Sequence, residues 1–169
     1  MGYVHDVNMF RFVPPEIAQY SAGAWTDNNG SDVWKKQKAA AAESFTIKVP
    51  INIPGNSAAS RGCYLKSIQV WYRIATAACT AFSCAIKKVT MPANGASVGS
   101  GVAQSFTYDT DHDAEAERYA IASHTMTLTI TTPFWIDSDE NVYLEIAVTS
   151  GATTVFNYYG IMVSYTLRV

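Results

Sequence analysis

Residues 123–136 read SHTMTLTITTPFWI, and the first part of this stretch alternates polar and apolar side chains with a period of two. In an extended chain Met126, Leu128 and Ile130 fall on one face, while the threonines between them fall on the other. Threonine is β-branched and suits a sheet face in contact with water. The stretch therefore predicts a strand with one buried face and one solvated face.

The same period recurs on both sides of this stretch. It predicts further strands at residues 45–53, 64–74, 81–89, 102–108, 141–149 and 161–168, with Gly160 as a bulge or bend before the last. Segments rich in turn-forming residues separate these runs, and the segments show no helical period. We predict an all-β protein, an antiparallel β-sandwich of jelly-roll type with about eight strands. An immunoglobulin-like sandwich is the alternative, although no Cys–Trp–Cys spacing supports it.

The N-terminal part of the chain has a different character. Pro14 and Pro15 favour an extended chain, and residues 32–43 have the composition of a short helix. We therefore divide the chain into an N-terminal arm, residues 1–44, and a jelly-roll domain, residues 45–169. Aromatic residues are expected to dock the arm, on its own sandwich or on a neighbouring subunit. The candidates for this interface are Phe10, Phe12, Trp25 and Trp34.

Composition excludes two classes of partner. The chain has 169 residues, 15% of them charged, and a formal net charge of −2, which argues against nucleic-acid binding. No apolar run approaches the ~20 residues that span a bilayer, so no membrane partner is expected. The N-terminal residues lack the basic and apolar regions of a signal peptide. We expect the protein to be made and used in the cytoplasm, or released by lysis.

Residues 109–118, DTDHDAEAER, hold five acidic residues and a histidine. Asp109, Asp111 and Asp113 alternate as at the start of an EF-hand loop, which makes them candidate calcium ligands. The likeness ends there, because alanines occupy the positions where an EF-hand needs glycine and a bidentate glutamate. An exposed, solvated loop is the favoured interpretation. A calcium site, within one subunit or between subunits, is the alternative.

The sequence lacks the motifs of enzymatic chemistry. His5, His112 and His124 belong to no metal-binding histidine pattern, the serines lie in no GxSxG, and the glycines form no phosphate-binding loop. Apart from the calcium hypothesis no cofactor is expected, and we predict that the protein is not an enzyme.

Three aromatic residues stand apart from the apolar phase of the strands. Trp71 lies on the polar phase beside Gln69, Trp135 follows a Pro-Phe pair, and Tyr158 comes shortly before Gly160. Such residues can form a platform on which sugar rings stack. They can equally be anchors of a subunit interface or lie under the arm.

Three blocks of the sequence resemble a family of virion proteins. They are FTIKVPINIPGNSAASRGCYLKSIQVWYRI, FSCAIKKV and VYLEIAVTSGATTVFNYYGIMVSYTLRV. They are similar to the single-domain jelly rolls of tailed-phage virion proteins over residues 45–169. The resemblance implies a homotrimeric capsid decoration (cement), head-fibre or tail-associated protein, with an N-terminal arm that attaches to capsid or other virion proteins. It implies no catalytic residue, and it implies a virion location after synthesis in the host cytoplasm.

Two functions therefore stay open. The first is a structural virion protein, on the outer surface of the particle, because a nearly neutral arm does not suit a position against the genome. The alternative is a carbohydrate- or receptor-binding module of a tail or fibre. In that case Trp71, Trp135 and Tyr158 stack on the sugar rings of a host glycan.

Overall fold

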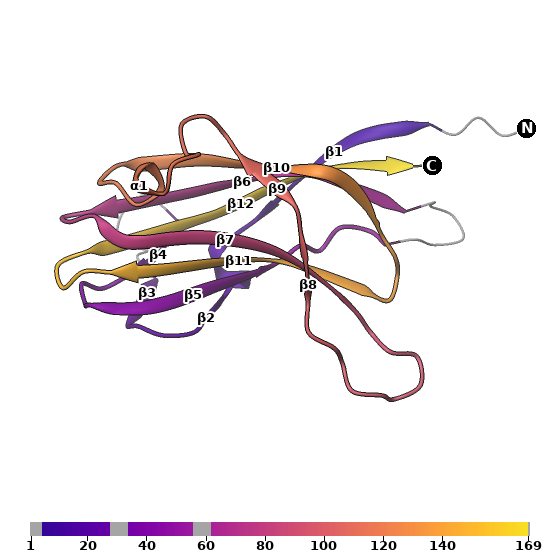
Figure 1. Cartoon of the computed structure of the whole chain (residues 1–169), viewed down its shortest axis with the longest axis horizontal. Helices are drawn as coiled ribbons and strands as arrows, with labels where there is room; N and C mark the ends of the chain where they lie inside the picture. Colours follow the sequence, from indigo (N-terminus) through magenta and orange to yellow (C-terminus); the bar gives the residue numbers. More distant parts are fainter. Residues whose placement is uncertain (1–4, 28–33, 56–61, 169) are drawn as a thin grey trace, which may run out of the picture.

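Two β-sheets pack face to face in the computed structural model, which describes residues 5–27, 34–55 and 62–168 (Figure 1). Every strand pair in these ranges is antiparallel. The predicted antiparallel β-sandwich of jelly-roll type is confirmed. The described residues form twelve strands rather than about eight, because the first 44 residues contribute four and the predicted strand at 102–108 is divided in two.

Sheet A has seven strands and sheet B has five. Sheet A contains β1 (Asp6–Val13), β3 (Trp25–Asp27), β4 (Lys36–Lys38), β6 (Cys63–Ala75), β9 (Phe106–Tyr108), β10 (Ser123–Ile136) and β12 (Val155–Arg168). Its order is β3-β4-β12-β6-β10-β9, and β1 pairs with the second half of β12. Sheet B contains β2 (Gln19–Tyr20), β5 (Glu43–Pro50), β7 (Cys79–Thr90), β8 (Val102–Gln104) and β11 (Glu140–Ser150), in the order β2-β5-β11-β7-β8.

The core between the sheets consists of the residues that the period of two assigns to the inner faces. Met126, Leu128 and Ile130 of β10 are buried, as predicted. The same holds for the inward-facing apolar positions of the neighbouring strands. These are Phe45, Ile47 and Val49 of β5, Ile68, Val70, Tyr72 and Ile74 of β6, Val142, Leu144, Ile146 and Val148 of β11, and Ile161, Val163 and Tyr165 of β12.

An aromatic row crosses the core at one end. The Trp25 ring meets Phe45 edge-on, with their centroids 5.4 Å apart. Phe45 lies 5.4 Å from Phe156, which in turn stacks on Tyr72 at 5.6 Å. Contacts of this kind add about 0.5–1.5 kcal/mol per pair beyond simple burial. Because Trp25 belongs to the first 44 residues, this segment helps to build the core.

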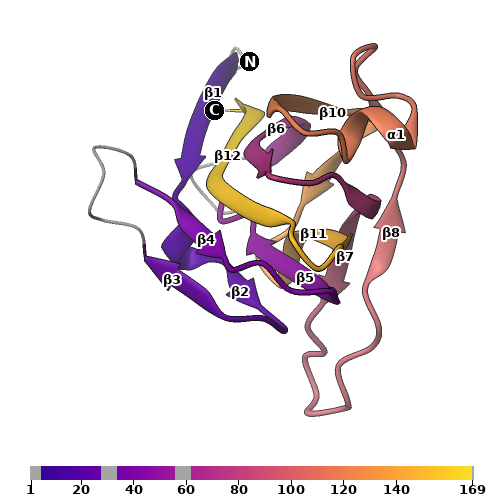
Figure 2. The same cartoon turned by 90° about the vertical axis from the view of Figure 1, so that its left-hand side faces the viewer.

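The strands of the first 44 residues are paired within both sheets. β1 and β4 lie against successive parts of β12, β3 pairs with β4, and β2 pairs with β5. Figure 2 shows these indigo strands along one side of the sandwich. The segment is largely extended, as predicted, and its described part packs on its own sandwich. Its attachment to a virus particle stays a prediction.

The helix predicted for residues 32–43 is wrong within the described part of that range. Residues 36–38 form β4, which pairs with Phe156–Tyr158 of β12, and β5 begins at Glu43. Lys38 is fully buried there, and its Nζ lies 2.8 Å from the Glu43 carboxylate and donates to the Ala39 and Ala41 carbonyls. Strand pairing and the contacts of the buried Lys38 outweigh the weak helix propensity of an alanine-rich segment.

Helices are minor elements in this fold. Among the described residues they are a 3₁₀ turn, η1 (Pro15–Ile17), and the one-turn α1 (Glu115–Arg118). Within the described ranges, no helix has the length and apolar character needed to span a membrane.

Gly160 forms a bulge in β12, as the sequence predicts. The register with β6 shifts between Tyr158 and Gly160, so that Tyr159 is the extra residue. Gly160 has a φ of +118°, and a Cβ at this position would lie 2.6 Å from the Val13 carbonyl oxygen. Glycine is needed here both for its backbone conformation and for the close approach of the end of β1.

Candidate ligand-binding face

The outer face of sheet A is built from β1, β12, β6 and β10, which lie side by side. Residues paired across neighbouring strands share a face of the sheet, so the register defines rows of side chains. One row contains Phe10, Ser164, Ser67 and Thr129. The next row contains Phe12, Met162, Gln69 and Thr127.

A shallow groove of about 410 Å³ lies over these two rows. Its lining mixes apolar side chains with hydroxyl and amide groups. The lining residues are Phe10, Ser67, Gln69, Thr127, Met162 and Ser164. Gln69 and Thr127 also contact each other, with Nε2 and Oγ1 3.5 Å apart. A surface that combines apolar area with a few polar groups is typical of ligand-binding sites.

A second hollow of about 390 Å³ continues along the same face. It is lined by Asp6, Asn8, Tyr64, Lys66, Pro133 and Thr166. Thr166 follows Ser164 on the outer face of β12, and Lys66 precedes Ser67 on β6, so the two hollows adjoin. Lys66 Nζ donates to Asn8 Oδ1 at 2.9 Å, which fixes the Lys66 side chain across β12.

Trp71 lies at one end of the groove. It follows Gln69 on the outer face of β6, is half-buried, and has its ring centroid 6.0 Å from that of Phe12. Phe10 is 67% exposed and Phe12 is 52% exposed. Large apolar side chains that stay in contact with water in one place mark a surface for binding.

Trp135 lies at the opposite end, in the part of β10 that pairs with the start of β6. Its ring is 3.6 Å from that of Tyr64, and the Arg168 guanidinium lies 4.9 Å from its centroid. Arg168 Nε donates to Asp6 Oδ1 at 2.8 Å. This hydrogen bond lowers the pKa of Asp6, so the pair stays ionised. The sequence-predicted Trp71 and Trp135 therefore share one face.

Tyr158 does not belong to this face, and its prediction as a platform residue is wrong for this conformation. The residue is fully buried and lies opposite Tyr72 in the core. The cause is the bulge at Tyr159 and Gly160, because one extra residue moves all preceding side chains of the strand to the other face.

The four predicted interface residues occupy two kinds of environment. Phe10 and Phe12 are exposed on β1, and Trp34 is 60% exposed just before β4. Trp25 is half-buried, packs on Phe45, and donates from Nε1 to the Ala22 carbonyl at 2.6 Å. Trp25 is thus largely engaged within its own sandwich, and the other three present their rings to solvent.

The acidic stretch at 109–118 is only partly the solvated loop that we predicted. Asp111, Asp113, Glu115 and Glu117 are exposed, but His112 and Arg118 are buried. Arg118 donates to the His112 and Asp113 carbonyls at 2.7 and 2.8 Å and covers the Tyr108 ring. The stretch is therefore a structured loop that ends in α1 and covers one end of the sandwich.

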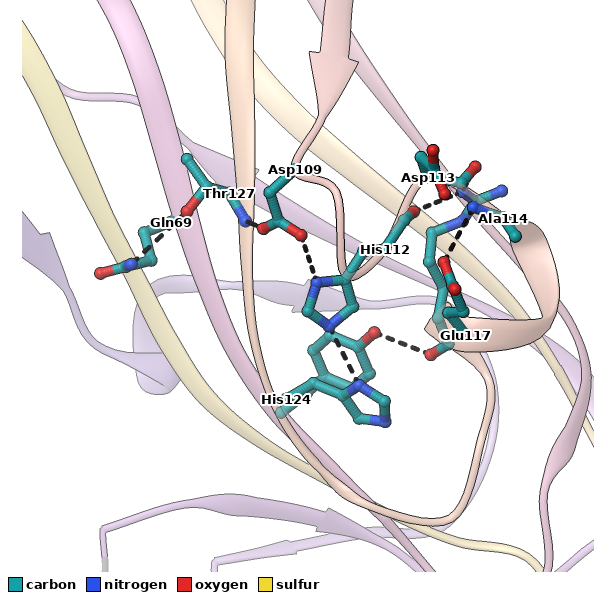
Figure 3. A network of polar contacts seen from close by, with 10 residues as sticks. Gln69, Asp109, His112, Asp113, Ala114, Glu117, His124 and Thr127 are labelled. Atoms are coloured by element: carbon teal, nitrogen blue, oxygen red, sulfur yellow. Dashed lines mark hydrogen bonds and ion pairs between the residues drawn. The ribbon is translucent and has the colours of Figure 1, made fainter.

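A chain of polar contacts joins this loop to β10 (Figure 3). Asp109 accepts from His112 Nδ1 at 2.6 Å and from the Thr127 backbone N–H. His112 Nε2 lies 3.1 Å from His124 Nδ1, and His124 Nε2 donates to the Ala120 carbonyl at 3.0 Å. Because Thr127 lines the groove, Asp109 helps to hold the groove wall in place.

The outer contacts of the histidine pair fix two of its N–H groups. The Asp109 carboxylate and the Ala120 carbonyl can only accept, so His112 Nδ1 and His124 Nε2 are the donors in these two contacts.

The burial of His124 makes the stability of the protein depend on pH. Burial lowers the pKa of His124, the hydrogen bond to Ala120 opposes this, and the charge of His112 adds to it. In the unfolded chain His124 binds a proton below its ordinary pKa of 6.5, whereas in the folded protein it does so only at lower pH. The free energy of unfolding therefore decreases as pH falls below 6.5. We expect the melting temperature of the wild type to drop more from pH 7 to pH 5 than that of His124→Gln. An equal drop in both would contradict this, and His5→Gln serves as the control.

The three candidate calcium ligands do not converge. Asp109 is engaged with His112 and Thr127, whereas Asp111 and Asp113 point to solvent. Among the residues that the structure describes, no group of three or more His, Cys, Asp or Glu side chains is placed to hold a metal ion. A calcium site in this loop stays a hypothesis.

Sequence reasoning missed the polar floor of the groove. Ser67, Gln69, Thr127 and Ser164 all lie on the polar phase of predicted strands, so their outward direction was available. The period of two does not say which strands are neighbours. The grouping of these residues around Trp71 became visible only with the strand order.

No protein-family model and no curated protein matches the chain. Among solved structures, the chain is similar to TmCBM61 in complex with β-1,4-galactotriose, with 10% identity, a TM-score of 0.40, and coverage of 91% of this chain and 86% of that one. It is also similar to the family 32 carbohydrate-binding module of C. perfringens NanJ in complex with galactose, with 12% identity, a TM-score of 0.28, and coverage of 89% and 99%.

Proposed function

We propose that this protein is a carbohydrate-binding β-sandwich module that holds a glycan along the outer face of sheet A. The observation that supports this most directly is the position of Trp71 and Trp135. Both lie on that face, one at each end of the two adjoining hollows. From Trp71 to Tyr64, the neighbour of Trp135, β6 runs for roughly 20 Å at about 3.3 Å per residue. This length suits several sugar units of an extended chain.

The chemistry of the groove fits a sugar. A pyranose presents C–H groups on its ring faces, which pack on aromatic rings, and hydroxyl groups around its edge. Ser67, Gln69 and Thr127 can both donate and accept hydrogen bonds, as a hydroxyl partner requires. None of the side chains that line the first groove is charged. The middle of the face therefore favours a neutral glycan.

The first test is binding to a glycan array, followed by calorimetry on the best ligand. We expect Trp71→Ala and Trp135→Ala each to weaken binding about tenfold or more, because an aromatic contact contributes of the order of 1.4 kcal/mol, which is a factor of ten. Trp34→Ala is the matched control, since Trp34 is exposed but lines neither hollow. Thermal unfolding of each variant separates lost binding from lost folding. Silence across a broad array, or unchanged affinity in both variants, would rule the proposal out.

A structural virion protein is the second candidate. The exposed rings of Phe10, Phe12 and Trp34 support it, because they could anchor the protein on a capsid or on other virion proteins. Under this proposal the protein is a homotrimer located on a virion. Light scattering would then give three times the mass of one chain, and Phe10→Ala with Phe12→Ala would reduce co-sedimentation with particles of the source virus.

A further inference from the structure

β1 is a long free edge of sheet A. It pairs with β12 on one side, and no strand within the described residues pairs with its other side (Figure 2). The other edge strands are short, since β2 has two residues and β3, β8 and β9 have three each. β1 has eight. Short edge strands expose few unpaired backbone groups. Among the described edge strands, β1 therefore offers the longest row of backbone N–H and C=O groups for pairing with another strand.

The side chains of β1 leave this edge open. Edge strands are commonly protected by charged side chains, proline or a short length. β1 has eight residues and no lysine or proline, and its two charged side chains are engaged within the chain, Asp6 with Arg168 and Arg11 with the Asn52 carbonyl. Its first seven residues are all exposed. Val7 and Met9 are 42% and 37% exposed on the inner side, while Phe10 and Phe12 are exposed on the outer side. Apolar surface therefore flanks the free edge on both faces.

We propose that two copies of this chain pair through β1, antiparallel and about a two-fold axis, so that sheet A of one continues into sheet A of the other. A second copy is the occupant that fits best, because the same edge serves both chains. Such an isologous contact uses both free edges at once and closes the assembly at two. A strand of another protein would not satisfy this symmetry.

The exposed residues fix the register. A two-fold axis perpendicular to the sheet pairs residues that point to the same face. The seven exposed residues run from Asp6 to Phe12, and their midpoint is Met9. Centred there, Met9 lies opposite Met9 of the partner subunit, Val7 lies opposite Arg11 of the partner subunit, and Asp6 lies opposite Phe12 of the partner subunit. No like charges face each other in this register, because Asp6 and Arg11 point to opposite faces of the sheet. Each is also engaged within its own chain, Asp6 with Arg168 and Arg11 with the Asn52 carbonyl.

Light scattering on the purified full chain tests the assembly. We expect twice the 18.4 kDa of one chain for the wild type, and the mass of one chain for Met9→Lys. Ile121→Lys is the control, because Ile121 is exposed away from β1 and should keep the doubled mass. A single-chain mass for the wild type at every concentration, a tripled mass, or a dimer that survives Met9→Lys would overturn the proposal.

A cross-link tests the register and does not depend on a disruptive variant. Met9→Cys should form an intermolecular disulfide on mild oxidation, whereas Val98→Cys, at an exposed site away from β1, should not. Equal cross-linking of both would overturn the register. Met9 lines neither hollow, so Met9→Lys is expected to keep any glycan binding. The dimer and the proposed function can therefore fail independently.

Discussion

Replacing Gly160 by alanine is expected to destabilise the protein by about 3 kcal/mol or more, the largest effect of any single substitution considered. The φ of +118° is strained for any residue with a Cβ, which costs of the order of 1–3 kcal/mol. The new Cβ would also lie 2.6 Å from the Val13 carbonyl oxygen and 3.0 Å from the Phe12 ring. Backbone cannot move aside cheaply, so an overpacking cost of about 1–3 kcal/mol adds to the strain. The midpoint of urea unfolding measures the loss.

Substitutions at two other glycines distinguish the cost of a strained φ from the cost of the steric clash. Gly95 also has a positive φ, +73°, but a Cβ there would meet nothing within 4 Å, so Gly95→Ala should cost only the strain. Gly99 has no positive φ and equally open surroundings, so Gly99→Ala should be close to neutral. If Gly160→Ala cost no more than Gly95→Ala, the close approach of β1 to the bulge would be refuted.

Asp109→Asn is expected to destabilise the protein by about 2 kcal/mol, within the usual range for losing a hydrogen bond to a charged group. Asp109 accepts from His112 and from the Thr127 backbone, one with each carboxylate oxygen. Asparagine has a single acceptor oxygen, so its NH₂ group would face one of these donors. Hydrogen bonding to Thr127 and His112 outweighs desolvation and lowers the pKa of Asp109, so this contribution is present above pH 3.8 and is lost as pH falls further.

Asp111→Asn provides the matched control for this prediction. Asp111 is exposed two residues along the same loop, so the same chemical change should shift stability by less than about 0.5 kcal/mol. Thermal unfolding at pH 7 measures both variants. Equal stability of the two would mean that the Asp109 contacts contribute nothing to the fold.

Local sequence patterns predicted the strands after residue 44 and the direction of most of their side chains. Alternation with a period of two is a local property, and burial of apolar residues is strong enough to hold each strand in phase. It therefore placed Met126, Leu128 and Ile130 in the core. It also placed Trp71 on an outer face, because Trp71 lies on the same side of its strand as Gln69, opposite the apolar residues.

Which strands are neighbours, and therefore which residues form the candidate site, depends on contacts between distant parts of the chain. The groove between Phe10 and Thr127 joins residues more than one hundred positions apart, which no local pattern records. Long-range pairing with β12 made residues 36–38 a strand in place of a helix. The bulge at Gly160 turned Tyr158 into the core, and packing against the sandwich buried His112 in a stretch that reads as solvated. In each case contacts distant in sequence outweighed local preference, because a residue gains more from burial and pairing than from its intrinsic propensity.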